Sequence, residues 1–330
     1  MISMYSSTAQ QNISYNNTIL TSFRTTNSYF IAYYPLFLVI IGTILNLLTF
    51  IVLCQATFNH KRKQSTIYYM RAIAIFDILM LYGWNFDHFI SNVFGFLLQR
   101  YSIFSCKILS FLNYFSAQTS AWLRVFMCID RYVFLTRLHR TWFNHSETVV
   151  IIIIFLILFL ALFNIHIPLF ACYYNDYGQI NVNARYYRVY PLWDYINLFV
   201  YNCLPFLLMI LFNSGVIYCL IRLKYLSSIK NSRIQYRAIS ITLVLTTFLF
   251  LLMTIPATVS FAFFYSKASI TLLHVFDSIL YTYHISSFPL YFFLYNEFRQ
   301  ECLALFKCTR NKKRKSSFQL RALPYIVERI

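Results

Sequence analysis

The fold is decided by the stretch Cys106–Arg137, which reads CKILSFLNYFSAQTSAWLRVFMCIDRYVFLTR. Its body is apolar and aromatic, and at about 1.5 Å of rise per residue a helix of this length crosses a bilayer with some tilt. A cysteine stands at one end, and the charged triplet Asp130-Arg131-Tyr132 stands near the other. Charged side chains are costly in hydrocarbon, so we expect the triplet at the water interface. The stretch therefore predicts a membrane-spanning helix.

The composition of the whole chain points the same way. Of its 330 residues, 59% are hydrophobic, 20% are aromatic and only 12% are charged, whereas soluble domains carry about a quarter charged residues. The net charge of +18 does not indicate nucleic-acid binding, because the basic residues occupy the short segments between apolar runs. The eight cysteines are scattered without metal-ligand spacing, so we expect neither a metal nor another cofactor.

Seven apolar runs follow a polar N-terminal segment, and each reaches the ~20 residues that a spanning helix needs. Helices are expected because hydrocarbon offers no water to the backbone. The sequence thus predicts an all-α membrane protein, a seven-transmembrane helix bundle within residues 29–296. The runs are 29–54, 67–92, 104–135, 148–170, 192–222, 239–265 and 272–295.

The distribution of lysine and arginine sets the expected orientation. With the N-terminus outside, 21 of the 28 basic residues lie on the cytoplasmic side, 6 lie outside and Arg124 lies within a span. Cytoplasmic loops are enriched in Lys and Arg, so this split predicts an extracellular N-terminus and a cytoplasmic C-terminus. We expect a multi-pass protein of the plasma membrane that contacts lipid on its outer faces.

The N-terminal segment 1–28 is predicted to be an extracellular tail. It is rich in Ser, Thr, Asn and Tyr, and it shows no apolar stretch typical of a cleavable signal peptide. Asn12 and Asn16 each begin an N-glycosylation sequon. Both are therefore candidate glycosylation sites.

Three features together resemble the rhodopsin-like (class A) G-protein-coupled receptors. Cys106 precedes Arg131 of the Asp130-Arg131-Tyr132 triplet by 25 positions, as in the third helix of that family. Asn46 in the first run and Asp77 in the second are similar to the family's intramembrane polar pair. Prolines, which kink helices by removing a hydrogen bond, interrupt each of the last three runs at Pro205, Pro256 and Pro289.

The resemblance implies roles for several residues. It implies a disulfide between Cys106 and Cys172, and docking of a heterotrimeric G protein at Asp130, Arg131 and Tyr132. It also implies a short amphipathic eighth helix at 297–308, followed by a basic cytoplasmic tail at 309–330. Cysteines near such a helix are candidates for S-palmitoylation, here Cys302 and Cys308.

Some positions depart from the family pattern. Thr254 stands where a tryptophan is usual in the sixth helix, and Phe288 and Phe292 replace residues of the usual Asn-Pro-x-x-Tyr motif in the seventh. The fifth helix has Asn213 in place of a tyrosine. These departures bear on the switches used in activation more than on the fold.

Arg124 is the most unusual of the intramembrane residues. It lies four positions after Ser120, on the same helix face, and Ser120 occupies a position that in the family helps the second-helix aspartate to bind sodium. Because an unpaired arginine in a membrane is costly, we hypothesise that Arg124 pairs with Asp77 and replaces the sodium ion. The alternative is that Arg124 lines a hydrated cavity on the cytoplasmic side.

The sequence constrains the identity of the ligand less than it constrains the fold. Asn113 stands where amine receptors of the family have aspartate, and Thr282 stands where opsins have the retinal lysine, so the resemblance implies neither ligand. Asp87 and Asp277 near the outer helix ends could face a cationic group. The tyrosine-rich loop at 172–193 is similar to the hairpin loops of peptide receptors, and the chain looks similar to small neuropeptide receptors, including the FMRFamide-like group.

The favoured function is therefore a G-protein-coupled receptor for an extracellular ligand, a neuropeptide by resemblance, and not an enzyme. Two alternatives stay open. One is an orphan or chemosensory class A receptor for a small non-amine ligand. The other is a seven-span channel or transporter, which would favour paired broken helices with ionisable residues.

Overall fold

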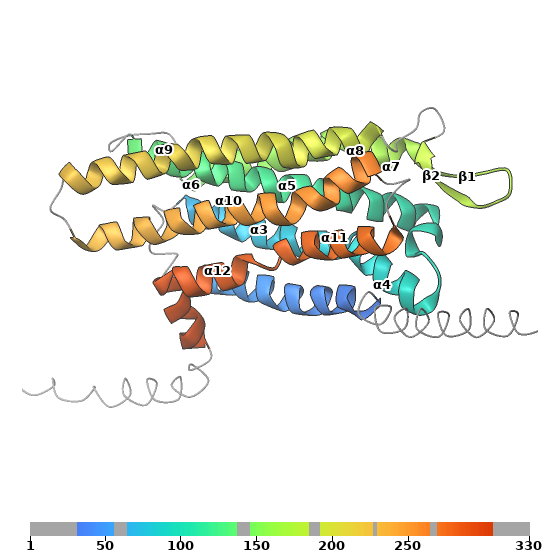
Figure 1. Ribbon diagram of the computed structural model, residues 1–330, viewed down its shortest axis with the longest axis horizontal. Coiled ribbons are helices and arrows are strands. Elements are labelled where there is room, and N and C mark those ends of the chain that lie inside the picture. Colours follow the sequence, from blue (N-terminus) through green and yellow to red (C-terminus); the bar gives the residue numbers. More distant parts are fainter. Residues whose placement is uncertain are drawn as a thin grey trace, which may run out of the picture.

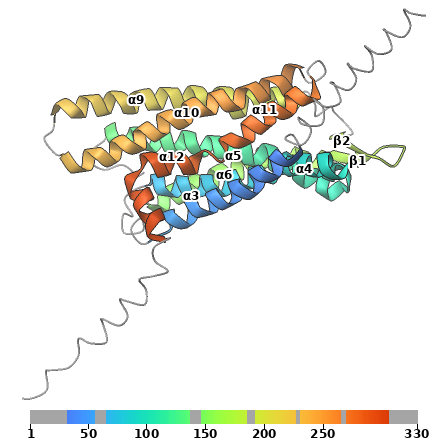
Figure 2. The same ribbon diagram turned by 60° about the horizontal axis from the view of Figure 1, so that its bottom comes forward.

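The computed structural model describes residues 32–55, 65–136, 146–184, 192–226, 230–264 and 269–305. Within these ranges the protein is a bundle of helices with one small β-hairpin at one end, which we call the hairpin end (Figures 1 and 2). The candidate glycosylation sites Asn12 and Asn16, the candidate lipidation site Cys308, and the segments 1–28 and 309–330 lie outside the described residues.

The elements follow the predicted runs, several of which are divided. Their order is a helix at Ala32–Leu53, α3 (Thr66–Leu81), α4 (Trp84–Phe94), the 3-10 turn η1 (Leu98–Arg100), α5 (Ile103–Thr136), α6 (Ser146–Phe163), α7 (His166–Phe170), β1 (Ala171–Tyr174), β2 (Ile180–Ala184), α8 (Leu192–Asn197), the π-helical segment η3 (Leu198–Cys203), α9 (Leu204–Leu226), α10 (Lys230–Phe264), α11 (Ile270–Tyr283), α12 (Ser287–Leu294) and a helix at 296–305.

Five stretches in the described part of the chain are long and apolar enough to cross a membrane. They are Ala32–Leu53, Thr66–Phe94, Glu147–Phe170, Leu192–Arg222 and Ile241–Phe264. Large apolar side chains on α6, including Ile151, Phe155 and Leu162, are exposed on the outside of the bundle. Such a face suits lipid and not water. The architecture is therefore all-α apart from the hairpin, and its apolar helices fit a multi-pass membrane protein.

The stretch that opened the sequence analysis, now α5, is not among these five. It is 34 residues long, but its middle carries Asn113, Gln118, Ser120 and Arg124, which lower its mean hydropathy. All four side chains are buried, since α5 packs against α3, α6 and α9. A helix enclosed by other helices does not have to present apolar side chains to lipid. For this reason α5 is less apolar than the five stretches.

Prolines account for two of the divisions in the helices. Pro205 has no backbone N–H to donate, and it stands at the second residue of α9, directly after the π-helical segment η3. Pro289 lies in the first turn of α12, where a missing N–H costs nothing. The turn at 284–286 therefore separates α11 from α12 within the run 272–295, which the sequence predicted to be interrupted at Pro289. Pro256, in contrast, stays inside α10.

The helix at 296–305 lies at the end opposite the hairpin and turns across the bundle (Figure 1). Its amphipathic pattern is as predicted, but the apolar side faces protein. Phe298 and Cys302 are fully buried in the main core, and the Phe298 ring packs edge-on against Phe288 and Tyr291 of α12. The candidate palmitoylation site Cys302 therefore does not present its thiol to lipid in this structure.

Candidate functional site

Three groups of residues predicted from sequence lie along α5. From the hairpin end they are the disulfide with its neighbouring pocket, a buried ionic cluster around Asp77, and the Asp130-Arg131-Tyr132 triplet. Because one straight helix carries a member of each group, α5 fixes their spacing.

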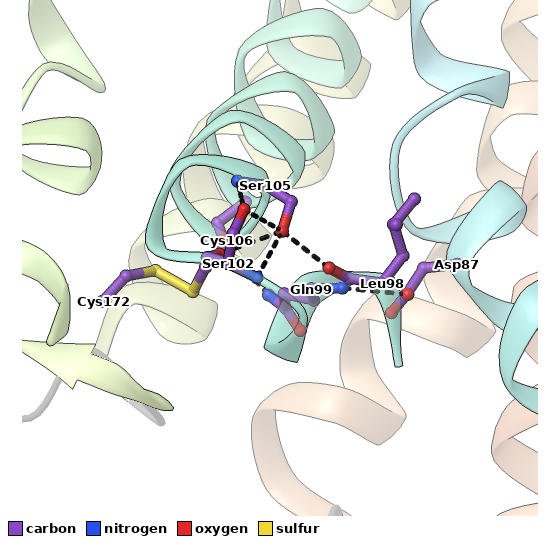
Figure 3. The surroundings of a disulfide bond; sticks show 8 residues. Asp87, Leu98, Gln99, Ser102, Ser105, Cys106 and Cys172 are labelled. Carbon is purple, nitrogen blue, oxygen red and sulfur yellow. Dashed lines mark hydrogen bonds between the residues drawn. A yellow bond between two sulfur atoms is a disulfide. The ribbon is translucent and has the colours of Figure 1, made fainter. Parts of the chain in front are cut away.

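A disulfide joins Cys106 in α5 to Cys172 in β1. Cys172 has a left-handed φ of 66°, and the register of the two strands shifts between Ala171 and Tyr173. This bulge directs the Cys172 side chain away from its partner strand, toward α5. Figure 3 shows the bridge beside the start of α5, where the Ser105 hydroxyl donates to the carbonyl of Leu98 (2.7 Å).

Asp87 lies at the same end but serves the local loop. Its Oδ1 accepts a hydrogen bond from the backbone N–H of Gln99 (3.1 Å; Figure 3), and its side chain is buried. Thr282, also a candidate ligand contact, bonds instead to Ser278 O and the Tyr34 hydroxyl. Neither residue is among the described residues that line the pocket described next.

A pocket opens between α4, α5, α8, α10 and α11 near the hairpin end, and we call it the hairpin-end pocket. It holds about 460 Å³ of space not filled by atoms, part of it open to solvent. Two of the predicted ligand contacts, Asn113 and Asp277, line it, together with Asp194, which the sequence reasoning did not select. Asp194 is an acidic residue at the start of the predicted span 192–222. An acidic residue at that position could have been selected from the sequence as a candidate ligand contact.

The buried cluster around Asp77, which we call the Asp77 network, joins α3, α5 and the turn between α11 and α12. Arg124 Nη2 donates to Asp77 Oδ2 at 2.7 Å, and both side chains are buried, at 3% and 0% exposure. The Ser120 hydroxyl donates to Asp77 Oδ1 at 2.6 Å. Arg124 also bonds to Ser120, and its Nη2 reaches the Ser287 hydroxyl at 3.2 Å.

His284 completes the network. Its Nδ1 lies 2.8 Å from Asp77 Oδ1, and its Nε2 lies 3.2 Å from the hydroxyl of Tyr201. A neutral imidazole satisfies both contacts, with Nδ1 donating to the carboxylate and Nε2 accepting from the phenol. Asn46 does not touch Asp77; it donates to the His284 carbonyl (3.0 Å) and so supports the same turn.

The guanidinium of Arg124 is enclosed on its remaining side. It lies over the ring of Tyr283 at 4.9 Å from the centroid, within the distance of a cation–π contact. The positive charge therefore has a carboxylate, two hydroxyls and an aromatic face as partners. This geometry has the Arg124–Asp77 contact of the sequence hypothesis, and the Arg124 side chain is buried.

The Asp130-Arg131-Tyr132 triplet lies at the other end of α5. Asp130 Oδ2 accepts hydrogen bonds from the hydroxyls of Ser65 (2.6 Å) and Thr66 (3.2 Å) at the start of α3. Arg131 is buried. The Tyr132 ring packs against Phe212 of α9 and leaves no room for a side chain at Gly215, where an added Cβ would come within 2.6 Å of the ring.

The departures Asn213 and Thr254 have defined partners. Asn213 Nδ2 donates to the hydroxyl of Thr247 at 2.8 Å, and the Thr254 hydroxyl donates to Asn202 Oδ1 at 2.6 Å. Both pairs join the fifth run of the sequence to the sixth, so polar contacts fill positions where the family has aromatic residues.

The chain matches no model of a known protein family. In the described part of the chain, no group of three or more His, Cys, Asp or Glu side chains is arranged to hold a metal ion.

Proposed function

We propose that this protein is a G-protein-coupled receptor of the rhodopsin-like class, which binds an extracellular ligand at the hairpin end and activates a heterotrimeric G protein at the opposite end. The observation that carries the proposal is the arrangement along α5. The disulfide at Cys106 and the carboxylate of Asp130 are 24 residues apart in one helix, about 36 Å. That separation slightly exceeds the ~30 Å hydrocarbon core.

The proposal requires two spans beyond the five apolar ones. We assign them to α5 and to the pair α11–α12. The latter runs from Ile270 to Leu294 with a turn at 284–286, and the turn's backbone is supported by Asn46 and His284 inside the protein. Broken helices are tolerated at membrane depth where protein encloses the break. The helix at 296–305 takes the place of the eighth helix.

The orientation follows from the sequence. The lysines and arginines that lie between apolar runs concentrate toward the Asp130 end, which the positive-inside rule assigns to the cytoplasm. The hairpin then faces outward at the plasma membrane. Tyr174 and Tyr177 on this hairpin are exposed, at 56% and 88%. Exposed tyrosines offer contact area at low entropic cost, and this favours a peptide as ligand.

The test expresses the full chain in cells with promiscuous G-protein reporters and challenges it with a neuropeptide library. The comparison variant is Arg131→Ala, and the matched control is Arg100→Ala, which changes an exposed arginine at the hairpin end. We expect a peptide to evoke a response that Arg131→Ala abolishes and Arg100→Ala retains, at equal surface expression.

Two outcomes would count against the proposal. A response that persists in Arg131→Ala would remove the role assigned to the triplet. No response to peptides or to a library of small non-amine ligands, with the protein at the cell surface, would argue against a coupling receptor.

A further inference from the structure

The described wall of the hairpin-end pocket holds two carboxyl groups and no basic side chain. Its acidic lining residues are Asp194 and Asp277, and none of the described residues that line it is a lysine, an arginine or a histidine. This is unexpected in a chain with a net charge of +18. Two carboxylates that face one space repel each other unless a cation or a proton joins them.

Asp277 is the more informative of the two. It projects from the middle of α11 and is 5% exposed, and its Oδ2 has no hydrogen-bond partner. The nearest basic group in the described part of the chain is His88, whose Nε2 lies 3.7 Å from that oxygen, too far for a hydrogen bond. This oxygen is buried and has no donor, which is costly, so a ligand that brings a donor to it would stabilise it.

Asp194 approaches the same pocket from α8. Its Oδ1 accepts a hydrogen bond from the hydroxyl of Tyr114 at 2.9 Å, which fixes the carboxylate. Tyr114, Trp84, Phe261 and Tyr281 supply aromatic walls. Aromatic faces attract cations, so the walls and the two carboxylates favour the same kind of guest.

Asp87 shows how a structural aspartate differs at this end of the bundle. It is equally buried, but a backbone N–H of the η1 turn occupies it (Figure 3), and it does not line the pocket. Asp277 differs from Asp87 because its Oδ2 has no hydrogen-bond donor, whereas Asp87 holds a loop through a hydrogen bond from Gln99.

We propose that the hairpin-end pocket binds its ligand through a positively charged organic group, a guanidinium or an ammonium, held by the carboxylates of Asp277 and Asp194. The inference rests on the proposed function, because it specifies the chemistry of that receptor's ligand site. Asn113, the position where amine receptors carry their aspartate, takes no part in the charge; its Oδ1 instead accepts from the Tyr281 hydroxyl (3.2 Å).

The test measures binding directly, with no dependence on G-protein coupling. The purified full chain in detergent is heated with millimolar benzoyl-argininamide, benzoyl-lysinamide or benzoyl-citrullinamide. Citrulline has nearly the shape of arginine without its charge. A ligand that binds the folded protein raises the unfolding midpoint. We expect the arginine or the lysine probe to raise it and the citrulline probe to leave it unchanged.

The variants assign the effect to the two carboxylates. Asp277→Asn keeps the shape and is expected to weaken binding of the cationic probe by about 30-fold or more, since it removes a charge pair from a buried site. Asp194→Asn is expected to weaken it too. Asp87→Asn is the matched control, and we expect it to bind the probe as the unchanged protein does. The midpoint of each variant without probe shows that it is folded.

The outcomes separate this inference from the function on which it rests. Equal stabilisation by the citrulline and arginine probes, or unchanged binding in Asp277→Asn, overturns the cationic pocket. A peptide response in cells that survives Asp277→Asn and Asp194→Asn overturns it as well, while leaving the receptor function in place. Charge-dependent probe binding without any G-protein response supports the pocket and counts against the receptor.

Discussion

Arg124 Nη2 and Asp77 Oδ2 lie 2.7 Å apart in the interior of the bundle, and neither side chain reaches solvent. The pair joins α5 to α3, and Ser287 extends it to the start of α12. Its two formal charges cancel, and hydrogen bonds from Ser120 and His284 occupy the other carboxylate oxygen. Removal of one partner leaves the other charge buried, so the two residues should depend strongly on each other.

The first prediction concerns that dependence. Arg124→Leu and Asp77→Asn should each destabilise the protein by about 3–5 kcal/mol, because each leaves a buried group without its partner. The double variant should cost clearly less than the sum, since it leaves no unpaired charge. Unfolding midpoints of the purified proteins in detergent measure the coupling.

Arg100→Leu serves as the control, because Arg100 is exposed and its loss should change the stability by no more than about 0.5 kcal/mol. If the losses of stability in Arg124→Leu and Asp77→Asn simply add in the double variant, the ion pair does not form in the purified protein.

The second prediction concerns sodium. A sodium ion at Asp77 needs several oxygen ligands, but the guanidinium occupies Oδ2 and two other donors occupy Oδ1. We therefore expect the unfolding midpoint to be the same in sodium chloride and in choline chloride at equal ionic strength. In Arg124→Ala the carboxylate regains an open side, and sodium should then raise the midpoint. A sodium dependence of the unchanged protein would contradict this account.

The sequence predicted the five apolar stretches and offered the Arg124–Asp77 contact as one of two alternatives, for one physical reason. Charged groups are so costly in hydrocarbon that two opposite charges in neighbouring spans are expected to form a pair. Asn46 was different, because its partner is a backbone carbonyl exposed by a helix break. Pro289 marks an interruption of the run in the sequence, but it does not show which backbone carbonyl the turn at 284–286 exposes.

The pocket was harder to predict from sequence than the ion pair. Asp87 and Asp277 look alike as acidic residues near helix ends, but the η1 turn supplies a donor to one and not to the other. Asp194 joins Asp277 only because α8 and α11 lie on the same pocket. Their roles are set by tertiary contacts between elements far apart in the chain, and no local pattern encodes these contacts.

The third prediction concerns the disulfide. Cys106 and Cys172 close a loop with a sequence separation of 66, and a loop of that length is worth roughly 4 kcal/mol in a chain-entropy estimate. Cys106→Ser and Cys172→Ser should lower the unfolding midpoint equally, and the double variant should cost no more than either one. A reducing agent should lower the midpoint of proteins that keep the bridge and leave the Cys106→Ser and Cys172→Ser variants unchanged. Cys219→Ser, which removes a cysteine outside the bridge, is the control, and a similar loss there would contradict the assignment.

The fourth prediction tests how the helix at 296–305 packs. Cys302 faces the core beside Phe298, and burial raises the pKa of its thiol above the usual value. Alkylating reagents attack through the thiolate, and a raised pKa means less thiolate at any given pH. Cys302 should therefore react with iodoacetamide more slowly than the exposed Cys54 at neutral pH, and its rate should keep rising to higher pH.

Variants that retain only Cys302 or only Cys54, besides the disulfide pair, allow the two rates to be compared by mass spectrometry. Equal rates would mean that the helix leaves the bundle, and palmitoylation of Cys302 would then be open to a lipid-modifying enzyme. A slow Cys302 would mean that the helix is held to α12 by its own apolar side, through Phe298, and needs no lipid anchor at Cys302 to keep its place.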